Sequence, residues 1–218
     1  MTDEWDCNVW ALHGRERSVL IDAGAGRTPL SPPPDVDTVL VTHLHFDHSA
    51  GAAALARQGL RVLAHPWTAE GLRAGDGERA GLDISQARGF YPPDFVIEPC
   101  PAEGVEPGAV IDLGGLSVTP VETPGHADGH LAYLAEGEDG TRTLFSGDLV
   151  FPGGYVFLQP LPDCRLDRLW ESLARVRELE PDGLYAGHYA PIEDDAVSHL
   201  DTAIAAFAAG GVPAQLPG

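Results

Sequence analysis

The chain has 218 residues, which is enough for one α/β domain with a full hydrophobic core, and we predict a single domain over residues 1–218. The formal net charge is −20, because 33 acidic residues outnumber 13 basic residues, all of which are arginine. An anionic surface repels phosphate backbones, so we expect no nucleic-acid partner. The sequence has no apolar run of about 18–20 residues, the length of a membrane span, and we expect no membrane partner.

The start of the chain and the cysteines bear on the compartment. The first residues are polar and acidic and do not resemble a secretory signal, so we expect a cytoplasmic protein. Cys7, Cys100 and Cys164 are odd in number and far apart, which argues against a disulfide framework. We expect all three thiols to be reduced and inert. The sequence does not indicate an oligomeric state.

The first part of the chain alternates short apolar runs with helical segments. We predict strands at residues 7–12, 18–21, 38–41 and 60–64. Four prolines within residues 28–35 predict a loop. Helices are predicted at residues 50–58, which are rich in alanine, and at residues 68–73. Residues 74–109 mix glycine, proline and acidic residues, and we interpret them as loop and short helix that form a flap over the site.

The second part begins with successive strands and ends with helices. Strands are predicted at residues 110–113, 116–121, 131–134, 143–145 and 184–186. Apolar residues at helical spacing, including Leu169, Leu173 and Val176, predict an amphipathic helix over residues 165–180. A last helix is predicted at residues 195–209. We find no repeat or linker.

The strongest chemical signal is the segment Thr42-His43-Leu44-His45-Phe46-Asp47-His48. Alternation along an extended segment places His43 and His45 on the same side. Asp47 and His48 then turn toward a second point, so one cluster can serve two adjacent metal ions. Imidazole and carboxylate groups suit zinc, and also iron or manganese.

Three later fragments offer further ligands. His126 follows the predicted strand at 116–121, Asp148 follows the strand at 143–145, and His188 follows the strand at 184–186. Each side chain therefore comes after the carboxyl end of a strand, where loops can converge on one pocket.

The pattern His43-x-His45-x-Asp47-His48, followed by His126, Asp148 and His188, resembles the metallo-β-lactamase superfamily. The resemblance spans essentially the whole chain and includes Asp22, which matches the early aspartate of the family. It implies an α/β fold, the four-layer αββα metallo-β-lactamase-like sandwich.

The resemblance also implies roles for single residues. His43, His45 and His126 would bind the first of two divalent metal ions. Asp47, His48 and His188 would bind the second, and Asp148 would bridge both. Asp22 would orient a ligand or the adjoining loop. We expect zinc, with iron or manganese as alternatives.

Such a site implies a hydrolase that acts on a small molecule. Hydroxide held by the two metals would attack the carbonyl carbon of a thioester, an ester or a lactone. Asp47 would orient the nucleophile and move its proton. Tyr155, in a loop after Asp148, is a candidate hydrogen-bond donor to the developing oxyanion.

Several branches of the superfamily remain to be separated. True β-lactamases have cysteine or serine where this chain has Asp148, so the pattern is more similar to hydroxyacylglutathione hydrolase and the acyl-homoserine lactonases. No lysine or arginine follows His188, which argues against glutathione as part of the substrate. We rank a thioester or ester ahead of a lactone. The alternative is a persulfide dioxygenase-like oxidoreductase with one iron on His43, His126 and Asp148.

Other conspicuous residues are interpreted as structural. We predict a hydrogen-bonding role for His130 and a solvated helix face for Arg165 and Arg168. For His65 we predict a structural role, with pocket lining as the alternative. Five aromatic side chains could line an apolar acyl pocket, although each fits the core better: Trp67, Phe90, Tyr91, Phe151 and Phe157.

Overall fold

The computed structural model describes residues 6–216, and the chain divides into two compact units, one up to Glu106 and one from Pro107 onward. The prediction of a single domain stays a prediction. Most of the acidic start on which the expected compartment depends, residues 1–5, lies outside the described residues. None of the helices within residues 6–216 has the length and apolar character that crossing a bilayer requires.

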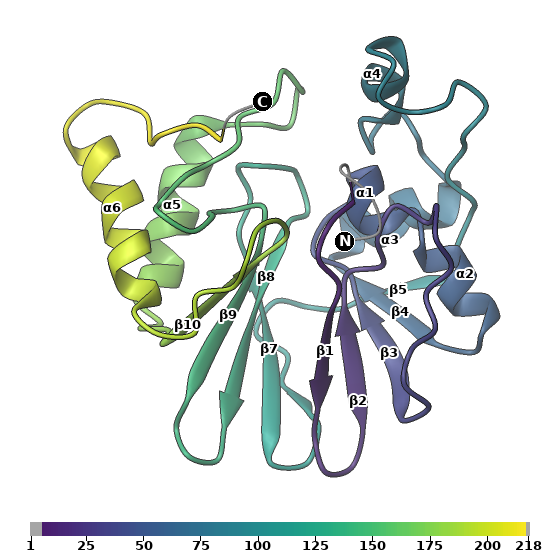
Figure 1. The fold of residues 1–218 in the computed structure, drawn as a ribbon, viewed down its shortest axis with the longest axis horizontal. Coiled ribbons are helices and arrows are strands. Elements are labelled where there is room, and N and C mark those ends of the chain that lie inside the picture. Colours follow the sequence, from purple (N-terminus) through teal and green to yellow (C-terminus); the bar gives the residue numbers. More distant parts are fainter. Residues whose placement is uncertain (1–5, 217–218) are drawn as a thin grey trace. The chain divides into compact units, whose positions relative to one another are not determined.

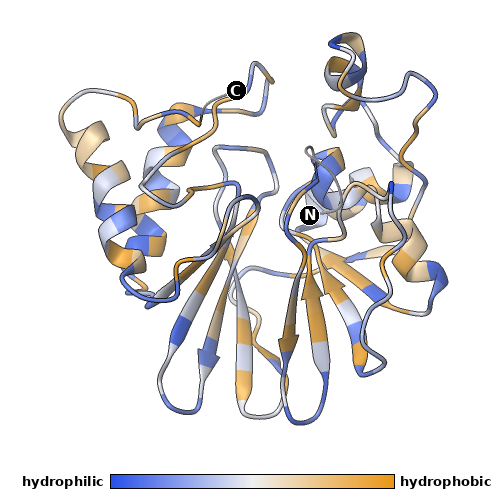
Figure 2. Ribbon diagram, in the orientation of Figure 1, coloured by the Kyte–Doolittle hydropathy of each residue, from blue (hydrophilic) through white to orange (hydrophobic). Residues whose placement is uncertain are grey.

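The first unit contains a five-stranded sheet in the order β1-β2-β3-β4-β5 (Figure 1). Its strands are β1 (Trp10–His13), β2 (Ser18–Ile21), β3 (Val36–Leu40), β4 (Arg61–Ala64) and β5 (Ala102–Gly104). β1 pairs with β2 antiparallel, and the other pairs are parallel. The central strands β2, β3 and β4 are mostly buried, which explains why apolar residues predominate in them (Figure 2).

Helices of the first unit lie between and after these strands. They are α1 (Phe46–Ser49), α2 (Ala52–Arg57), α3 (Pro66–Ala74) and α4 (Leu82–Ala87). α2 and α3 pack on β4, and α3 also packs on β5. His65 caps α3, because its Nδ1 accepts a hydrogen bond from the backbone of Trp67 at 3.1 Å and Pro66 occupies the first turn. The predicted structural role of His65 is confirmed.

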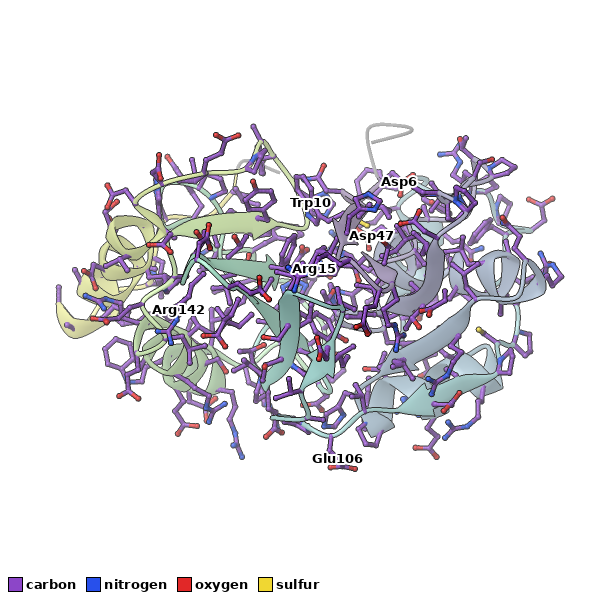
Figure 3. All side chains as sticks on the ribbon, turned by 90° about the horizontal axis from the view of Figure 1, so that it is seen from below. Asp6, Trp10, Arg15, Asp47, Glu106 and Arg142 are labelled. Carbon is purple, nitrogen blue, oxygen red and sulfur yellow. The ribbon has the colours of Figure 1, made fainter. Side chains whose placement is uncertain are left out.

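The second unit contains another five-stranded sheet, in the order β10-β9-β8-β7-β6. Its strands are β6 (Ile111–Asp112), β7 (Leu116–Glu122), β8 (Leu131–Gly137), β9 (Arg142–Gly147) and β10 (Gly183–Ala186). β6 to β9 are antiparallel neighbours, whereas β10 runs parallel to β9. Arg142, labelled in Figure 3, starts β9 and donates to the backbone carbonyl of Leu179 at 3.0 Å.

Two helices complete the second unit and lie side by side in Figure 1: α5 (Leu166–Arg177) and α6 (Ala196–Ala208). The apolar stripe of α5, which includes Leu169, Leu173 and Val176, shares one core with Leu144 of β9 and Leu200 of α6. This is the amphipathic helix predicted from the spacing of the apolar residues.

The predicted elements are present, with shifts of a few residues at their ends. The prediction for residues 74–109 was incomplete, because it contained a loop and a short helix but no strand. α4 is the short helix, and β5 is the missed strand, which pairs with β4 through Ala102, Glu103 and Gly104. The flap stays a prediction.

Candidate metal centre

In the first unit, four of the predicted ligands follow β3. The chain continues beyond Leu40 in extended form, and His45 is the residue that precedes α1. His43, His45 and His48 are buried, whereas the Asp47 side chain is 17% exposed. Asp47, labelled in Figure 3, stands in the first turn of α1. The segment after β3 and the helix α1 together bring three imidazoles and one carboxylate into one region of this unit.

Distances within this group are short. His43 Nε2 lies 3.1 Å from His45 Nδ1, and His48 Nε2 lies 3.7 Å from Asp47 Oδ2. The ring centroids of His43 and His48 are 4.1 Å apart. The four side chains thus lie close together, and their division between two metal ions stays a prediction.

Asp22 contacts this group through hydrogen bonds to Thr42 and His48. Its carboxylate accepts hydrogen bonds from the backbone N–H of Thr42 at 2.7 Å and from the Thr42 hydroxyl at 2.9 Å. It also lies 2.8 Å from His48 Nδ1, so Nε2 is the His48 nitrogen suited to bind a metal ion. Asp22 adopts a left-handed φ of 65°. The predicted orienting contact of Asp22 is confirmed.

A buried cysteine also belongs to this group, and sequence reasoning missed it. Ligand atoms of Cys7, Asp22 and His48 all lie within 4.8 Å of one another. Burial raises the pKa of the Cys7 thiol to about 12, an effect that outweighs the opposing influence of His48. The thiol is therefore neutral at ordinary pH. Nothing in the spacing of Cys7 indicates this contact, because 15 positions separate it from Asp22.

In the second unit, the other three predicted ligands meet at one edge of the sheet. β7, β9 and β10 all run in the same direction, because β7 and β9 are both antiparallel to β8 and β10 is parallel to β9. His126, Asp148 and His188 follow the carboxyl ends of these strands.

Asp148 lies between the two histidines. Its Oδ2 is 3.7 Å from His126 Nε2 and 3.6 Å from His188 Nε2. His126 and Asp148 are buried, and the side chain of His188 is 24% exposed. A carboxylate that is equally close to two imidazoles suits the bridging role that the family pattern implied.

Neighbouring groups fix the orientation of these side chains. His126 Nδ1 lies 3.0 Å from the carbonyl of Phe157, so Nε2 is directed toward Asp148. His130 Nδ1 lies 2.8 Å from the Thr123 hydroxyl, and its Nε2 accepts from the backbone N–H of Asp148 at 3.3 Å. The predicted structural role of His130 is confirmed, and its partner is the backbone of the candidate bridging residue.

The donor sets of both units fit divalent metal ions. Two ligand atoms on one tetrahedral zinc ion lie about 3.3 Å apart, because each is about 2.0–2.1 Å from the metal. The observed pair distances are 3.1 Å, 3.6 Å and 3.7 Å, so each pair could share an ion after small shifts. Five imidazoles with two carboxylates is a ligand chemistry typical of zinc, iron or manganese.

Tyr155 follows Asp148 in the sequence and lines a cavity of about 460 Å³ in the second unit. Its side chain is 39% exposed, and its backbone pairs with that of Phe151. The hydrogen bond from Tyr155 to a developing oxyanion stays a prediction.

The remaining side chains have structural partners. Arg165 forms an ion pair with Asp128, and Arg168 lies 3.8 Å from Glu171, which confirms the solvated helix face. Trp67 stacks on the guanidinium of Arg79 at 3.8 Å. Of the other aromatic candidates, Tyr91 and Phe151 are buried, Phe157 is half-buried and Phe90 is 43% exposed.

Comparison with known proteins identifies the family. Residues 2–188 match the family model of the metallo-beta-lactamase superfamily, and the chain belongs to this superfamily. The resemblance stated from the ligand pattern is therefore confirmed. Membership also implies that the chain binds divalent metal.

Two relatives are hydrolases by name. Acyl-coenzyme A thioesterase MBLAC2 of Gallus gallus is 31% identical over 199 residues, which cover 81% of this chain and 69% of the relative. Hydroxyacylglutathione hydrolase of Rhodopseudomonas palustris is 33% identical over 153 residues, which cover 69% of this chain but only 47% of the relative. These similarities support a hydrolase at the level of the family.

Solved structures confirm the predicted metallo-β-lactamase-like α/β fold. An archaeal superfamily protein from Sulfolobus tokodaii matches with a TM-score of 0.72 and 26% identity, over 91% of this chain and 79% of that chain. A family protein from Thermus thermophilus matches with a TM-score of 0.69 and 23% identity, over 96% of this chain and 77% of that chain.

Proposed function

We propose that this protein is a metal-dependent hydrolase that cleaves a thioester, an ester or a lactone, and that its seven candidate ligands hold two divalent metal ions. The observation that carries the proposal is the position of Asp148, whose Oδ2 lies 3.7 Å and 3.6 Å from the imidazoles of His126 and His188. In a member of this superfamily, such a carboxylate is suited to join two ions.

The proposed assignment follows the ligand pattern. His43, His45 and His126 bind the first ion, Asp47, His48 and His188 bind the second, and Asp148 binds both. Zinc is the first choice, with iron or manganese as alternatives. When bound, the ions lower the pKa of a water molecule and stabilise negative charge on the carbonyl oxygen of the substrate.

Residues of the chain then hold and transfer a proton of the attacking water molecule. The oxygen of water adds to the acyl carbon, the C–S or C–O bond breaks, and one proton of water ends on the leaving thiol or alcohol. Asp47 is suited to hold this proton, because its carboxylate is partly exposed and lies beside His48. Asp22 keeps His48 in one tautomer throughout. Tyr155 donates a hydrogen bond to the oxyanion.

The relatives favour a thioester over a lactone. The names acyl-coenzyme A thioesterase and hydroxyacylglutathione hydrolase both describe cleavage of an acyl group from a thiol carrier. Because the chain is strongly anionic, with a net charge of −20, we propose a small and weakly charged substrate in the cytoplasm.

The test compares hydrolysis of an acetyl thioester, an acetyl ester and an acyl-homoserine lactone, with and without a chelator. We expect chelation to abolish activity and added zinc to restore it. Asp148→Ala should lower kcat by at least about a hundredfold, because the charge stabilisation supplied by bound metal is worth several kcal/mol. Asp139→Ala, in an exposed hairpin, is the matched control. Full activity and two tightly bound ions in Asp148→Ala would contradict the proposal.

A further inference from the structure

The second unit contains an apolar cavity of about 460 Å³, and Tyr155 alone among its lining residues has a part in the proposed chemistry. None of its lining residues carries a charged side chain, and two of them are prolines. The lining consists of Pro152, Tyr155, Tyr189, Ala190, Pro191, Ile192 and Leu216.

Backbone pairing holds the walls of this cavity in place. Phe151 pairs with Tyr155, and the N–H of Phe151 donates to the carbonyl of Tyr155 at 2.9 Å. Leu184 and Ile192 exchange two hydrogen bonds of 2.8 Å and 2.9 Å, which close the loop after β10. The backbone of Val156 accepts from Leu216 at 3.1 Å. These hydrogen bonds order the backbone around the cavity, and an ordered backbone lowers the entropic cost of binding.

The cavity adjoins one of the candidate metal ligands. Tyr189 follows His188 directly, and the ring of Phe151 lies 6.2 Å from the ring of His188 and 6.1 Å from that of Tyr189. Tyr189 has a φ of 72°, a left-handed conformation that is rare for an aromatic residue. Leu184 and Ile192, which flank this residue in the sequence, pair through their backbones, and strain of this kind is often found at binding sites.

We propose that this cavity binds the apolar acyl chain of the substrate, so that the enzyme prefers medium-length aliphatic acyl groups. This inference rests on the proposed function, because it assumes that the scissile carbonyl lies beside Asp148 and His188. An uncharged, mostly apolar lining stabilises methylene groups and would leave phosphate or carboxylate groups poorly solvated. The cavity therefore takes the acyl side of the substrate and not a charged leaving group.

The test uses N-acetylcysteamine thioesters with acetyl, butanoyl, hexanoyl and octanoyl groups. The leaving group is constant, so the slope of kcat/KM against acyl length reports only the acyl site. In the wild type, kcat/KM should rise by about threefold or more for each methylene that enters the cavity. Leu216→Ser and Ile192→Ser should flatten this slope. Val212→Ser, an exposed position in the same C-terminal segment as Leu216, should keep it.

A binding measurement separates this inference from the proposed function. The S-octyl thioether of N-acetylcysteamine cannot be hydrolysed, and its affinity is measured by calorimetry. We expect binding to weaken at least about fivefold in Leu216→Ser and to be unchanged in Val212→Ser.

The outcomes are distinct. If thioesters are hydrolysed but kcat/KM does not depend on acyl length, the cavity proposal is wrong and the hydrolase proposal stands. If no substrate is hydrolysed while the thioether binds and Leu216→Ser weakens it, the hydrolase proposal is wrong and the acyl site stands. Thioether binding that is equal in all variants overturns the acyl site.

Discussion

Asp22 controls the orientation of His48 through a contact of 2.8 Å between its Oδ2 and His48 Nδ1. The same carboxylate accepts two hydrogen bonds from Thr42, whose hydroxyl lies 3.0 Å from His43 Nδ1. One buried carboxylate thus influences two candidate ligands. Partners of this kind set the tautomer of a metal-binding histidine and raise its basicity.

Asp22→Asn tests this influence. Asparagine tolerates a left-handed φ, so the fold should be retained. The change removes the negative charge beside His48, and we expect metal affinity to fall by about 10- to 100-fold, measured by competition with a chelator. Asp83→Asn, at an exposed position in the first turn of α4, is the control. Equal affinities in both variants would show that Asp22 does not act on the ligands.

The thiols provide a second prediction at the scale of single residues. Burial raises the pKa of Cys100 to about 11, because the charged thiolate is poorly solvated there. Because of the raised pKa, the thiol stays neutral at pH values at which an ordinary cysteine has already lost its proton. The reactive thiolate should therefore form only as the pH approaches 11. Native Cys100 should therefore resist iodoacetamide at mildly alkaline pH, as measured by mass spectrometry.

Cys164 is the internal comparison for this reaction. Burial raises its pKa as well, but its side chain is only half-buried, so it should react faster than Cys100. Unfolding in urea should make the two rates similar. Rapid modification of Cys100 in the native protein would contradict the burial described here.

Among single residues, the candidate metal ligands could be predicted from the sequence, whereas a buried residue that lies beside them could not. Histidines and aspartates in close spacing have a recognisable chemistry, and within each unit the structure brings them together. Cys7 could not be found in this way. A lone cysteine resembles any small buried residue, and only the fold brings it close to Asp22 and His48.

At the scale of elements, Gly125 lies where the loop that carries His126 contacts the helix α5. Its φ is 137°, and a Cβ atom at this position would lie 2.3 Å from the backbone nitrogen of Leu169 in α5. The carbonyl of Gly125 also accepts from the backbone of Arg165 at 2.7 Å. The close approach of α5 therefore fixes the loop that carries His126.

Gly125→Ala should destabilise the protein by about 1–3 kcal/mol, because the added methyl group forces the loop away from α5. The measurement is the free energy of unfolding in urea. Gly140→Ala is the control, since Gly140 also has a positive φ, of 84°, but a Cβ atom there meets nothing within 4 Å. If both variants lose the same stability, the contact with α5 carries no cost and the explanation is wrong.

Most elements could be predicted because their apolar residues recur with a clear period, as in α5. β5 could not, since Ala102, Glu103 and Gly104 include one glycine and no β-branched residue. Its pairing with β4 defines it as a strand. The predicted strand at residues 110–113 is shortened to Ile111–Asp112, and Gly114 and Gly115, both with positive φ, follow directly.

At the scale of the whole molecule, the ligand pattern was sufficient to predict the family, whereas the substrate was not accessible from it. Branches of the superfamily that act on different substrates resemble one another in these ligands. The residues that bind the acyl group must therefore be sought outside the ligand pattern. The cavity proposed for it is lined by residues between Pro152 and Leu216, and backbone pairing brings them together. Such a set of scattered apolar residues has no period that a sequence pattern could reveal.

The prediction of a single domain can be tested by unfolding. Variants that keep only Trp67, in the first unit, or only Trp170, in the second, report on each unit by fluorescence. If the metal-free protein is one domain, the two urea curves should coincide with each other and with the curve from circular dichroism. Two separate transitions would show two domains.

The central claim is the two-metal site, and metal analysis of the purified protein tests it most directly. The account predicts about two equivalents of a zinc-type metal per chain, and about one equivalent in His188→Ala because the second ion loses a ligand. Hydrolysis of a thioester should accompany this metal content. A single equivalent of iron per chain, with oxygen consumption on a persulfide substrate, would contradict the hydrolase assignment while leaving the fold unchanged.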